Sequence, residues 1–291
     1  MTEPTNTLSD SAATQAELWG ERARDWADVM EGWSGWALPL YRHLLERVPA
    51  GSETRLLDIG CGAGRFCRMA ADRGAQVAGI DATGPLVEIA RERIPDGDFR
   101  VGDMAHLPWP DDSFDIVTGF NSFFIADDMV QALREARRVA RPGASVAMTV
   151  FGRPERCQST SVFSSLRQFS PSPPKSKETG PALHEEGVLE ALAAQAGLTP
   201  KEAAYLPFTE AYPNLQTMVR GYLAAAPFVR AMRAAGEEAV REALTEALRP
   251  LQTPAGRYAL ADEVRYLITT AEHHDQDRGL NPALPEQGKP R

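Results

Sequence analysis

The sequence Leu56-Leu-Asp-Ile-Gly-Cys-Gly-Ala-Gly-Arg-Phe66 predicts a short apolar strand that runs into a turn with glycine at positions 60, 62 and 64. Glycine allows the tight turn and lets the backbone approach a ligand, because no Cβ stands in the way. A turn that binds a nicotinamide dinucleotide would have its third glycine at position 65, where the helix under the pyrophosphate begins. Position 65 is arginine, and the acid Asp58 precedes the turn. The turn therefore does not favour a nicotinamide-dependent oxidoreductase.

Short apolar stretches alternate with helical stretches around this turn. The predicted strands cover residues 56–59, 77–80, 99–101, 116–117, 146–151, 198–208 and 264–269. The predicted helices between them cover residues 64–74, 85–93, 128–139 and 185–196. Such alternation is typical of parallel strands joined by helical crossovers. We expect an α/β fold with a doubly wound, seven-stranded, mostly parallel sheet that binds its ligand at the carboxyl ends of the strands.

Two helical additions extend this predicted core. Apolar residues recur at steps of three and four from Ala16 to Met30, which predicts one amphipathic helix in an N-terminal cap. Two apolar stripes within residues 214–250 predict a helical insertion before the last strand. Residues 152–181 include the run Ser170-Pro-Ser-Pro-Pro-Lys-Ser-Lys177, so we expect a mobile loop there. The predicted organisation is a disordered N-terminus (1–12), a helical cap (13–50), a ligand-binding domain with the insertion (51–274) and a disordered tail (275–291).

The composition argues against several classes of function. A formal net charge of −9 opposes binding to a polyanion, so we expect no nucleic-acid partner. Apolar runs stay far below the roughly 20 residues that cross a bilayer, so we expect no membrane contact. The polar N-terminus has no secretory signal, which favours a cytoplasmic location. Cys61, Cys67 and Cys157 lack the spacing of a disulfide framework or a zinc site, and we expect no metal.

The segment Asp58-Ile-Gly-Cys-Gly-Ala-Gly64 resembles the first motif of the class I methyltransferases that use S-adenosylmethionine (SAM). Three further stretches resemble that family in the same order. Asp81 resembles the acid that binds the ribose hydroxyls, and Asp103-Met104 resembles the pair that contacts adenine. The run from Asp103 to Asp115 resembles the methyltransferase type 11 branch with the ubiquinone and menaquinone C-methylases, and Arg141-Pro-Gly-Ala144 resembles the turn before the fifth strand. The resemblance covers about residues 50 to 151, with weaker agreement as far as residue 270.

This resemblance implies that SAM is the methyl donor and that a small molecule is methylated at oxygen, nitrogen or carbon. The implied donor site consists of Asp58, Gly60, Gly62, Gly64, Asp81, Ala82, Asp103, Met104, Phe120 and Asn121. The cap and the insertion would roof the acceptor with Trp19, Trp26, Trp33, Trp36, Tyr41 and Tyr222. These aromatic residues favour an apolar or aromatic metabolite, unless they serve only to pack the cap against the domain. The resemblance implies secondary metabolism as one context, since many methyltransferases of secondary metabolism resemble the same branch.

We assign no catalytic base from the sequence. The sulfonium already activates the methyl group, so we expect proximity to supply most of the catalysis. His106 and His184 are candidates, but a lone histidine near a loop is more typical of a solvated surface group.

Two other classes of function are weighed against this expectation. A non-catalytic, SAM-binding regulatory protein of the same fold would have an occluded acceptor cavity. A tRNA or protein methyltransferase would need a recognition face or a further domain, for which the sequence gives no sign. The chain is expected to act as a monomer or a homodimer, and the sequence does not distinguish the two.

Overall fold

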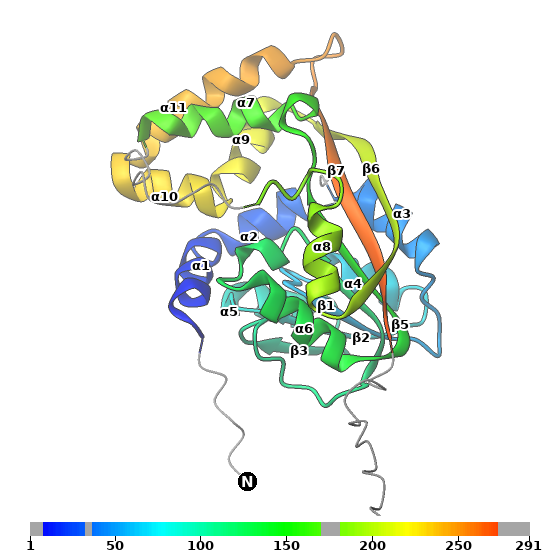
Figure 1. Cartoon of the computed structure of the whole chain (residues 1–291). Coiled ribbons are helices and arrows are strands. Elements are labelled where there is room, and N and C mark those ends of the chain that lie inside the picture. Colours follow the sequence, from blue (N-terminus) through cyan, green and yellow to red (C-terminus); the bar gives the residue numbers. More distant parts are fainter. Residues whose placement is uncertain (1–7, 33–36, 170–180, 273–291) are drawn as a thin grey trace, which may run out of the picture.

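A seven-stranded β-sheet forms the centre of the computed structural model, which describes residues 8–32, 37–169 and 181–272 (Figure 1). The strand order is β3-β2-β1-β4-β5-β7-β6. β7 runs antiparallel to both of its neighbours, and the other adjacent strands are parallel. The strands are β1 (Arg55–Ile59), β2 (Gln76–Asp81), β3 (Asp98–Val101), β4 (Phe114–Phe120), β5 (Ala140–Phe151), β6 (Leu198–Tyr212) and β7 (Tyr258–Ala271). The predicted doubly wound, mostly parallel sheet is confirmed.

Helices cover both faces of the sheet, which explains why its central strands are almost wholly apolar. Leu56, Leu57 and Ile59 of β1 are all fully buried, although successive side chains of a strand point to opposite faces. One face packs against α3 (Leu38–Arg47), α4 (Arg65–Ala71) and α5 (Gly84–Arg93). The other face packs against α6 (Met129–Val139) and α8 (Val188–Gln195). In the part of the chain that the structure describes, no helix is long and apolar enough to span a membrane.

The strand order reverses between β1 and β4. The chain adds β2 and β3 on one side of β1, and then adds β4 and β5 on its other side. Crossovers that diverge in this way open a crevice at the carboxyl ends of the two strands. The glycine turn follows β1 at this crevice, and Asn121 follows β4.

The N-terminal cap is more broken than the sequence predicts. It consists of α1 (Asp10–Gly20), α2 (Ala23–Asp25) and the π-helical turn η1 (Trp26–Met30), followed by α3, which packs on the sheet. The predicted continuous helix over residues 16–30 is wrong, because Arg22 leaves helical geometry with φ −129° and ψ 38°. The expected disorder of residues 1–12 is wrong from residue 10 onwards, since the Ser9 side chain caps α1 by accepting a hydrogen bond from the N–H of Ala12. Residues 1–7 and the whole of the predicted disordered tail, 275–291, lie outside the described residues.

β6 and β7 continue past the end of β5 and carry a helical roof (Figure 1). Between them lie α9 (Leu215–Leu223), α10 (Ala226–Ala235), α11 (Glu237–Leu248) and η5 (Arg249–Leu251), so the predicted helical insertion is confirmed. The roof also contains η3 (Pro154–Arg156), α7 (Ser159–Ser164) and η4 (Ser165–Phe169). The expectation of a loop throughout residues 152–181 is therefore wrong for these segments. Val162 and Leu166 are buried in the apolar cluster of the roof, which orders this part of the chain.

Arg265 of β7 forms an ion pair that links the sheet to α8. The Arg265 side chain is 2% exposed, and it donates to Glu190, whose side chain is 24% exposed. Loss of one partner leaves the other charge unpaired in a medium of low dielectric constant, which costs about 3–5 kcal/mol for a fully buried pair. We predict that Glu190→Ala lowers the free energy of unfolding by about 3 kcal/mol, the lower end of that range, because Glu190 is partly exposed. Urea unfolding of Glu190→Ala and of the control Glu186→Ala, a change at an exposed acid, measures the effect. Coincident unfolding curves for the two variants would show that the ion pair adds no net stability.

Candidate active site

A cavity of about 730 Å³ lies at the carboxyl ends of the parallel strands. Its volume falls within the range of roughly 300–1,000 Å³ that is usual for small-molecule sites. All predicted donor-site residues except Gly64 line it, namely Asp58, Gly60, Gly62, Asp81, Ala82, Asp103, Met104, Phe120 and Asn121. The sequence motifs, which are spread over four strands, therefore meet in one place.

The glycine turn brings three elements together. Gly60 and Gly62 have φ values of +74° and +54°, a region that residues with a Cβ rarely adopt. A Cβ on Gly60 would lie 2.4 Å from the Cβ of Ser122, and one on Gly62 would lie 2.4 Å from Oε1 of Glu31. Gly64 instead precedes α4 and approaches Ala90 of α5, where a Cβ would come within 2.9 Å. The structure thus places Gly64 in the packing between two helices and not at the cavity wall.

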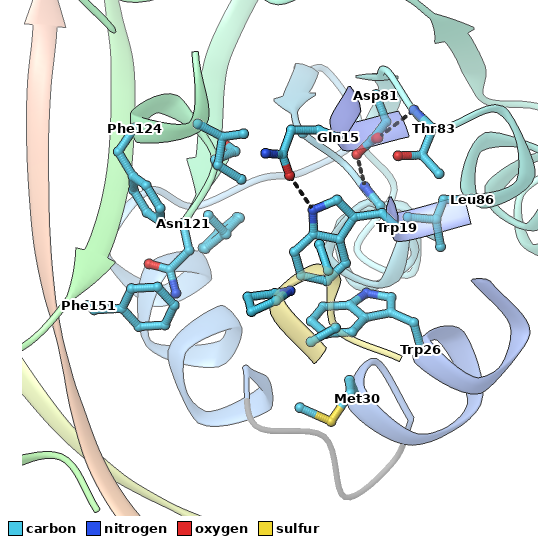
Figure 2. A pocket seen from close by; sticks show the side chains of 18 of the residues that line it. Gln15, Trp19, Trp26, Met30, Asp81, Thr83, Leu86, Asn121, Phe124 and Phe151 are labelled. Atoms are coloured by element: carbon cyan, nitrogen blue, oxygen red, sulfur yellow. Dashed lines mark hydrogen bonds between the residues drawn. The ribbon is translucent and has the colours of Figure 1, made fainter. Parts of the chain in front are cut away.

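Two acids at the ends of β2 and β3 accept backbone hydrogen bonds with both oxygens. Asp81 accepts from the N–H groups of Gly62 and Thr83, each at 2.9 Å (Figure 2). Asp103 accepts from the N–H of Ala105 at 2.9 Å and from that of Ser9 at 3.1 Å. Burial raises the pKa of Asp81, whereas at Asp103 burial is outweighed by these hydrogen bonds, and its pKa is lowered. Each carboxylate is held rigidly and still has lone pairs that face the cavity.

Asp58 at the end of β1 is buried in the cavity floor. It is 2% exposed, and one of its oxygens accepts from the Thr118 hydroxyl at 2.7 Å. Burial raises the pKa of Asp58 to about 8, although the hydrogen bond from Thr118 acts in the opposite direction. Burial therefore favours the protonated form of this carboxyl group, which can donate a hydrogen bond.

Glu31 is a site residue that the sequence analysis missed. Its carboxylate is 7% exposed and accepts from the N–H of Ala63 at 2.8 Å and from Nε1 of Trp26 at 3.0 Å. Arg93 Nη1 donates to the other oxygen at 2.8 Å and to the carbonyl of Ala63 at 2.8 Å. Burial raises the pKa of Glu31 in spite of Arg93. This network links the cap to the glycine turn and to α5.

Aromatic side chains from the cap and the roof line the cavity. Trp19 and Trp26 meet edge to face with ring centroids 4.6 Å apart, and both lie beside Leu86 in Figure 2. Tyr41 packs against Phe120 with centroids 4.7 Å apart, and Tyr222 of α9 is 2% exposed. The structure thus brings four of the six predicted aromatic residues together at the cavity. Trp33 and Trp36 lie outside the described residues.

Asn121 carries an unsatisfied amide at the opposite wall of the cavity. Its φ is +50°, a conformation that asparagine tolerates better than most residues, and its Oδ1 accepts from the Thr149 hydroxyl at 3.2 Å. Its Nδ2 is buried and has no hydrogen-bond partner among the described residues. Figure 2 shows Asn121 beside Phe124 and Phe151, whose ring centroids are 5.7 Å apart. A buried N–H without a partner is costly, so Nδ2 is suited to donate to a bound ligand.

Two buried acids from β6 and β7, Glu210 and Asp262, also line the cavity and were not predicted. Phe208 and Glu210 of β6, and Asp262 and Val264 of β7, line the cavity at a spacing of two residues, and Glu263 lines it as well. The signal available in the sequence was a strand pattern with a period of two, in which Glu210 and Asp262 are counted among the residues that face inward. The candidate bases lie elsewhere, since His106 is exposed and His184 is half-buried outside the cavity lining.

Comparison with known proteins agrees with this geometry. Residues 57–148 match a family model described as a methyltransferase domain. Over 144 residues the chain is 35% identical to 27-O-demethylrifamycin SV methyltransferase of Amycolatopsis mediterranei, which covers 46% of this chain and 53% of that protein. Over 113 residues it is 33% identical to demethylmenaquinone methyltransferase of Renibacterium salmoninarum, and this match covers 39% of this chain and 48% of that protein. The chain thus spans about half the length of these curated relatives.

Solved structures share the fold at low sequence identity. Phosphoethanolamine N-methyltransferase 2 of Haemonchus contortus, in complex with S-adenosylhomocysteine, matches with a TM-score of 0.58 and 17% identity over 91% of this chain and 61% of that one. The [4+2]-cyclase SpnF matches with a TM-score of 0.57 and 19% identity, over 90% of this chain and 97% of that one. These likenesses show the Rossmann-like methyltransferase fold.

The contact between Gly62 and Glu31 yields a prediction about stability. Gly62→Ala adds a Cβ in a left-handed conformation and forces the Glu31 carboxylate away from Ala63. We expect a loss of about 2–4 kcal/mol in the free energy of unfolding, of which about 1 kcal/mol is backbone strain. Gly143→Ala is the matched control, because Gly143 has φ +80° and open space around its Cβ position. Thermal or urea unfolding of both variants separates the cost of backbone strain from the cost of displacing Glu31. Equal losses in the free energy of unfolding would contradict the stabilising role of Glu31.

Proposed function

From the membership of residues 57–148 in a family of methyltransferase domains, we propose that this chain transfers a methyl group from SAM to a small, apolar or aromatic metabolite. One observation supports this most directly. A continuous cavity joins the glycine turn, Asp81 and Asp103 to an aromatic chamber under the helical roof. A donor and an acceptor can therefore lie end to end within it.

The residues of the donor end suit the chemistry of SAM. Asp81 offers two fixed acceptor oxygens to a pair of ribose hydroxyls, and Asp103 with Met104 is suited to an adenine ring. The bare backbone at Gly60 and Gly62 leaves room for the methionine part of the molecule. Within this proposal the remaining donor-site residues are Asp58, Ala82, Phe120 and Asn121.

Bound SAM supplies a methyl group that is already activated by its positive sulfur. The task of the chain is then to align the acceptor, exclude water and leave a path for any proton that the acceptor loses. The Phe124 and Phe151 rings and the unsatisfied Nδ2 of Asn121 are placed to orient an acceptor at the edge of β4 and β5. The methylated atom, whether oxygen, nitrogen or carbon, depends on the acceptor. We assign His106 and His184 no part in the reaction.

Secondary metabolism is the proposed context, since a relative with 35% identity is named for a rifamycin-type substrate. We place the protein in the cytoplasm as a monomer or homodimer. The competing function is that of a SAM-binding regulatory protein with no acceptor. The open chamber beyond the donor end favours the enzyme, because a regulatory protein needs only the donor end.

Titration calorimetry of the purified protein with SAM, S-adenosylhomocysteine and NAD tests the donor. We expect micromolar binding of the first two and none of NAD, because position 65 is arginine.

Asp81→Ala should weaken SAM binding roughly 10- to 150-fold, since hydrogen bonds to a charged group contribute about 1.5–3 kcal/mol. Asp96→Ala, at an exposed acid far from the cavity lining, should bind SAM as the unaltered protein does. Unchanged affinity in Asp81→Ala would show that Asp81 does not hold the donor.

A further inference from the structure

The two buried acids of β6 and β7 lie beyond the carboxyl edge of the parallel strands. Phe151, the last residue of β5, pairs with Val264 of β7, whereas Glu210 of β6 pairs with Leu260. Leu260 and Val264 are four residues apart, which corresponds to about 13 Å along a strand. Glu210 therefore lies about 13 Å past the carboxyl edge of the parallel strands, and Asp262, two residues from Val264, lies about 7 Å past it. This end of the cavity is separate from the region where SAM is proposed to bind.

The carboxyl groups at this remote end are held in place by polar neighbours. Glu210 is 5% exposed and accepts from the Tyr212 hydroxyl at 2.6 Å, and Tyr222 also hydrogen-bonds to it. Asp262 is 7% exposed and accepts from the N–H of Ser159 at 3.0 Å. Both acids line the cavity, so the two carboxyl groups have fixed positions in its wall.

This pair of acids has no counter-ion of its own. Within residues 8–32, 37–169 and 181–272, neither Glu210 nor Asp262 forms an ion pair, whereas the neighbouring Glu263 pairs with Arg153. The basic residues of the cavity lining, Arg167 and Arg230, are exposed. Burial of a carboxyl group without a cation favours its neutral form, and a cation that enters the cavity would stabilise the ionised form. The remote end is thus complementary to a positively charged ligand.

We propose, building on the proposed methyltransferase function, that the acceptor carries a protonated amine that binds between Glu210 and Asp262 while a different atom of the same molecule receives the methyl group. A protonated amine has no free electron pair, so it is not itself the nucleophile. Tyr222 and Phe163, whose ring centroids are 6.2 Å apart, provide aromatic surface next to the cation. The substrate class is accordingly an apolar or aromatic amine with its reactive atom remote from the nitrogen.

Two probes of almost equal shape test this inference. Tyramine has an aromatic ring and a primary amine, and tyrosol has a hydroxyl in place of the amine. Calorimetric titration of the full-length protein, with and without S-adenosylhomocysteine, should show that tyramine binds roughly 10- to 150-fold more tightly, as expected for hydrogen bonds to a charged group. Equal binding of both probes, or binding of neither, would overturn the inference.

Glu210→Gln keeps the size of the side chain and an acceptor for Tyr212 but removes the charge. This variant should lose most of the preference for tyramine and keep its affinity for tyrosol and for S-adenosylhomocysteine. Asp262→Asn should reduce the preference independently, so the inference stays testable if Glu210→Gln folds poorly. Glu238→Gln, at an exposed acid of α11, should behave as the unaltered protein does. A full preference for tyramine in both Glu210→Gln and Asp262→Asn would contradict the proposed site.

The pH dependence gives a second readout. Burial raises the pKa of Glu210 to about 8, with Asp262 adding to the rise and Tyr212 opposing it, and burial also raises the pKa of Asp262. The amine needs an ionised partner, so tyramine affinity should increase from pH 6 to pH 8 and a proton should be released on binding at pH 7. Glu210→Gln should flatten this increase. A flat profile in the unaltered protein would contradict the inference.

The outcomes separate this inference from the donor proposal. Failure of S-adenosylhomocysteine to bind would overturn the methyltransferase proposal on which the inference rests. Normal binding of S-adenosylhomocysteine together with no preference for tyramine would overturn the amine site alone.

Discussion

The lack of side chains at Gly60 and Gly62 is the constraint on which the cavity depends. A Cβ at either position would collide with a different element, with Ser122 after β4 in one case and with Glu31 of the cap in the other. The segments after β1 and β4 and the cap can therefore pack together only because Gly60 and Gly62 have no side chains. Glu31 then fixes the cap by binding Ala63 and Arg93. The shape of the donor end follows from the close packing of Ser122 and Glu31 against the glycine turn.

The cavity contains more buried acids than a stable apolar core would, and its two ends satisfy them differently. Asp81 and Asp103 receive backbone N–H groups, which are fixed donors that need no counter-ion. Glu210 receives only phenol hydroxyls in a wall that it shares with Asp262. Backbone donors stabilise the charged form of a carboxyl group, whereas burial near a second acid favours the neutral form. At Asp81 the backbone donors offset the effect of burial only in part, since the pKa of Asp81 is still raised; under our proposal a cation offsets it at the remote end.

Local patterns in the sequence predicted the sheet and most of the donor end. Short apolar strands followed by glycine or an acid mark the carboxyl edges, and these positions converge because the strands are parallel. Glu31 was not predictable, since Asp25 and Asp28 of the same segment have similar surroundings in the sequence but pair with Arg220 at the surface. The lengths of β6 and β7 were underestimated because Glu210 and Asp262 interrupt their apolar pattern. Burial of these acids depends on α7 and α9, which come from distant parts of the chain.

The hydrogen bond from the N–H of Ser9 to Asp103 closes the first turn of α1 over the end of β3. A molecule held by Asp103 is thereby covered by residues of α1, including Gln15 and Trp19. Under the proposed function, a donor held by Asp103 would lie beneath this helix, and its exchange after the reaction would depend on how readily α1 moves. The contacts of α1 with Asp103 and with Arg233 of α10 would then influence how fast the used donor leaves the site.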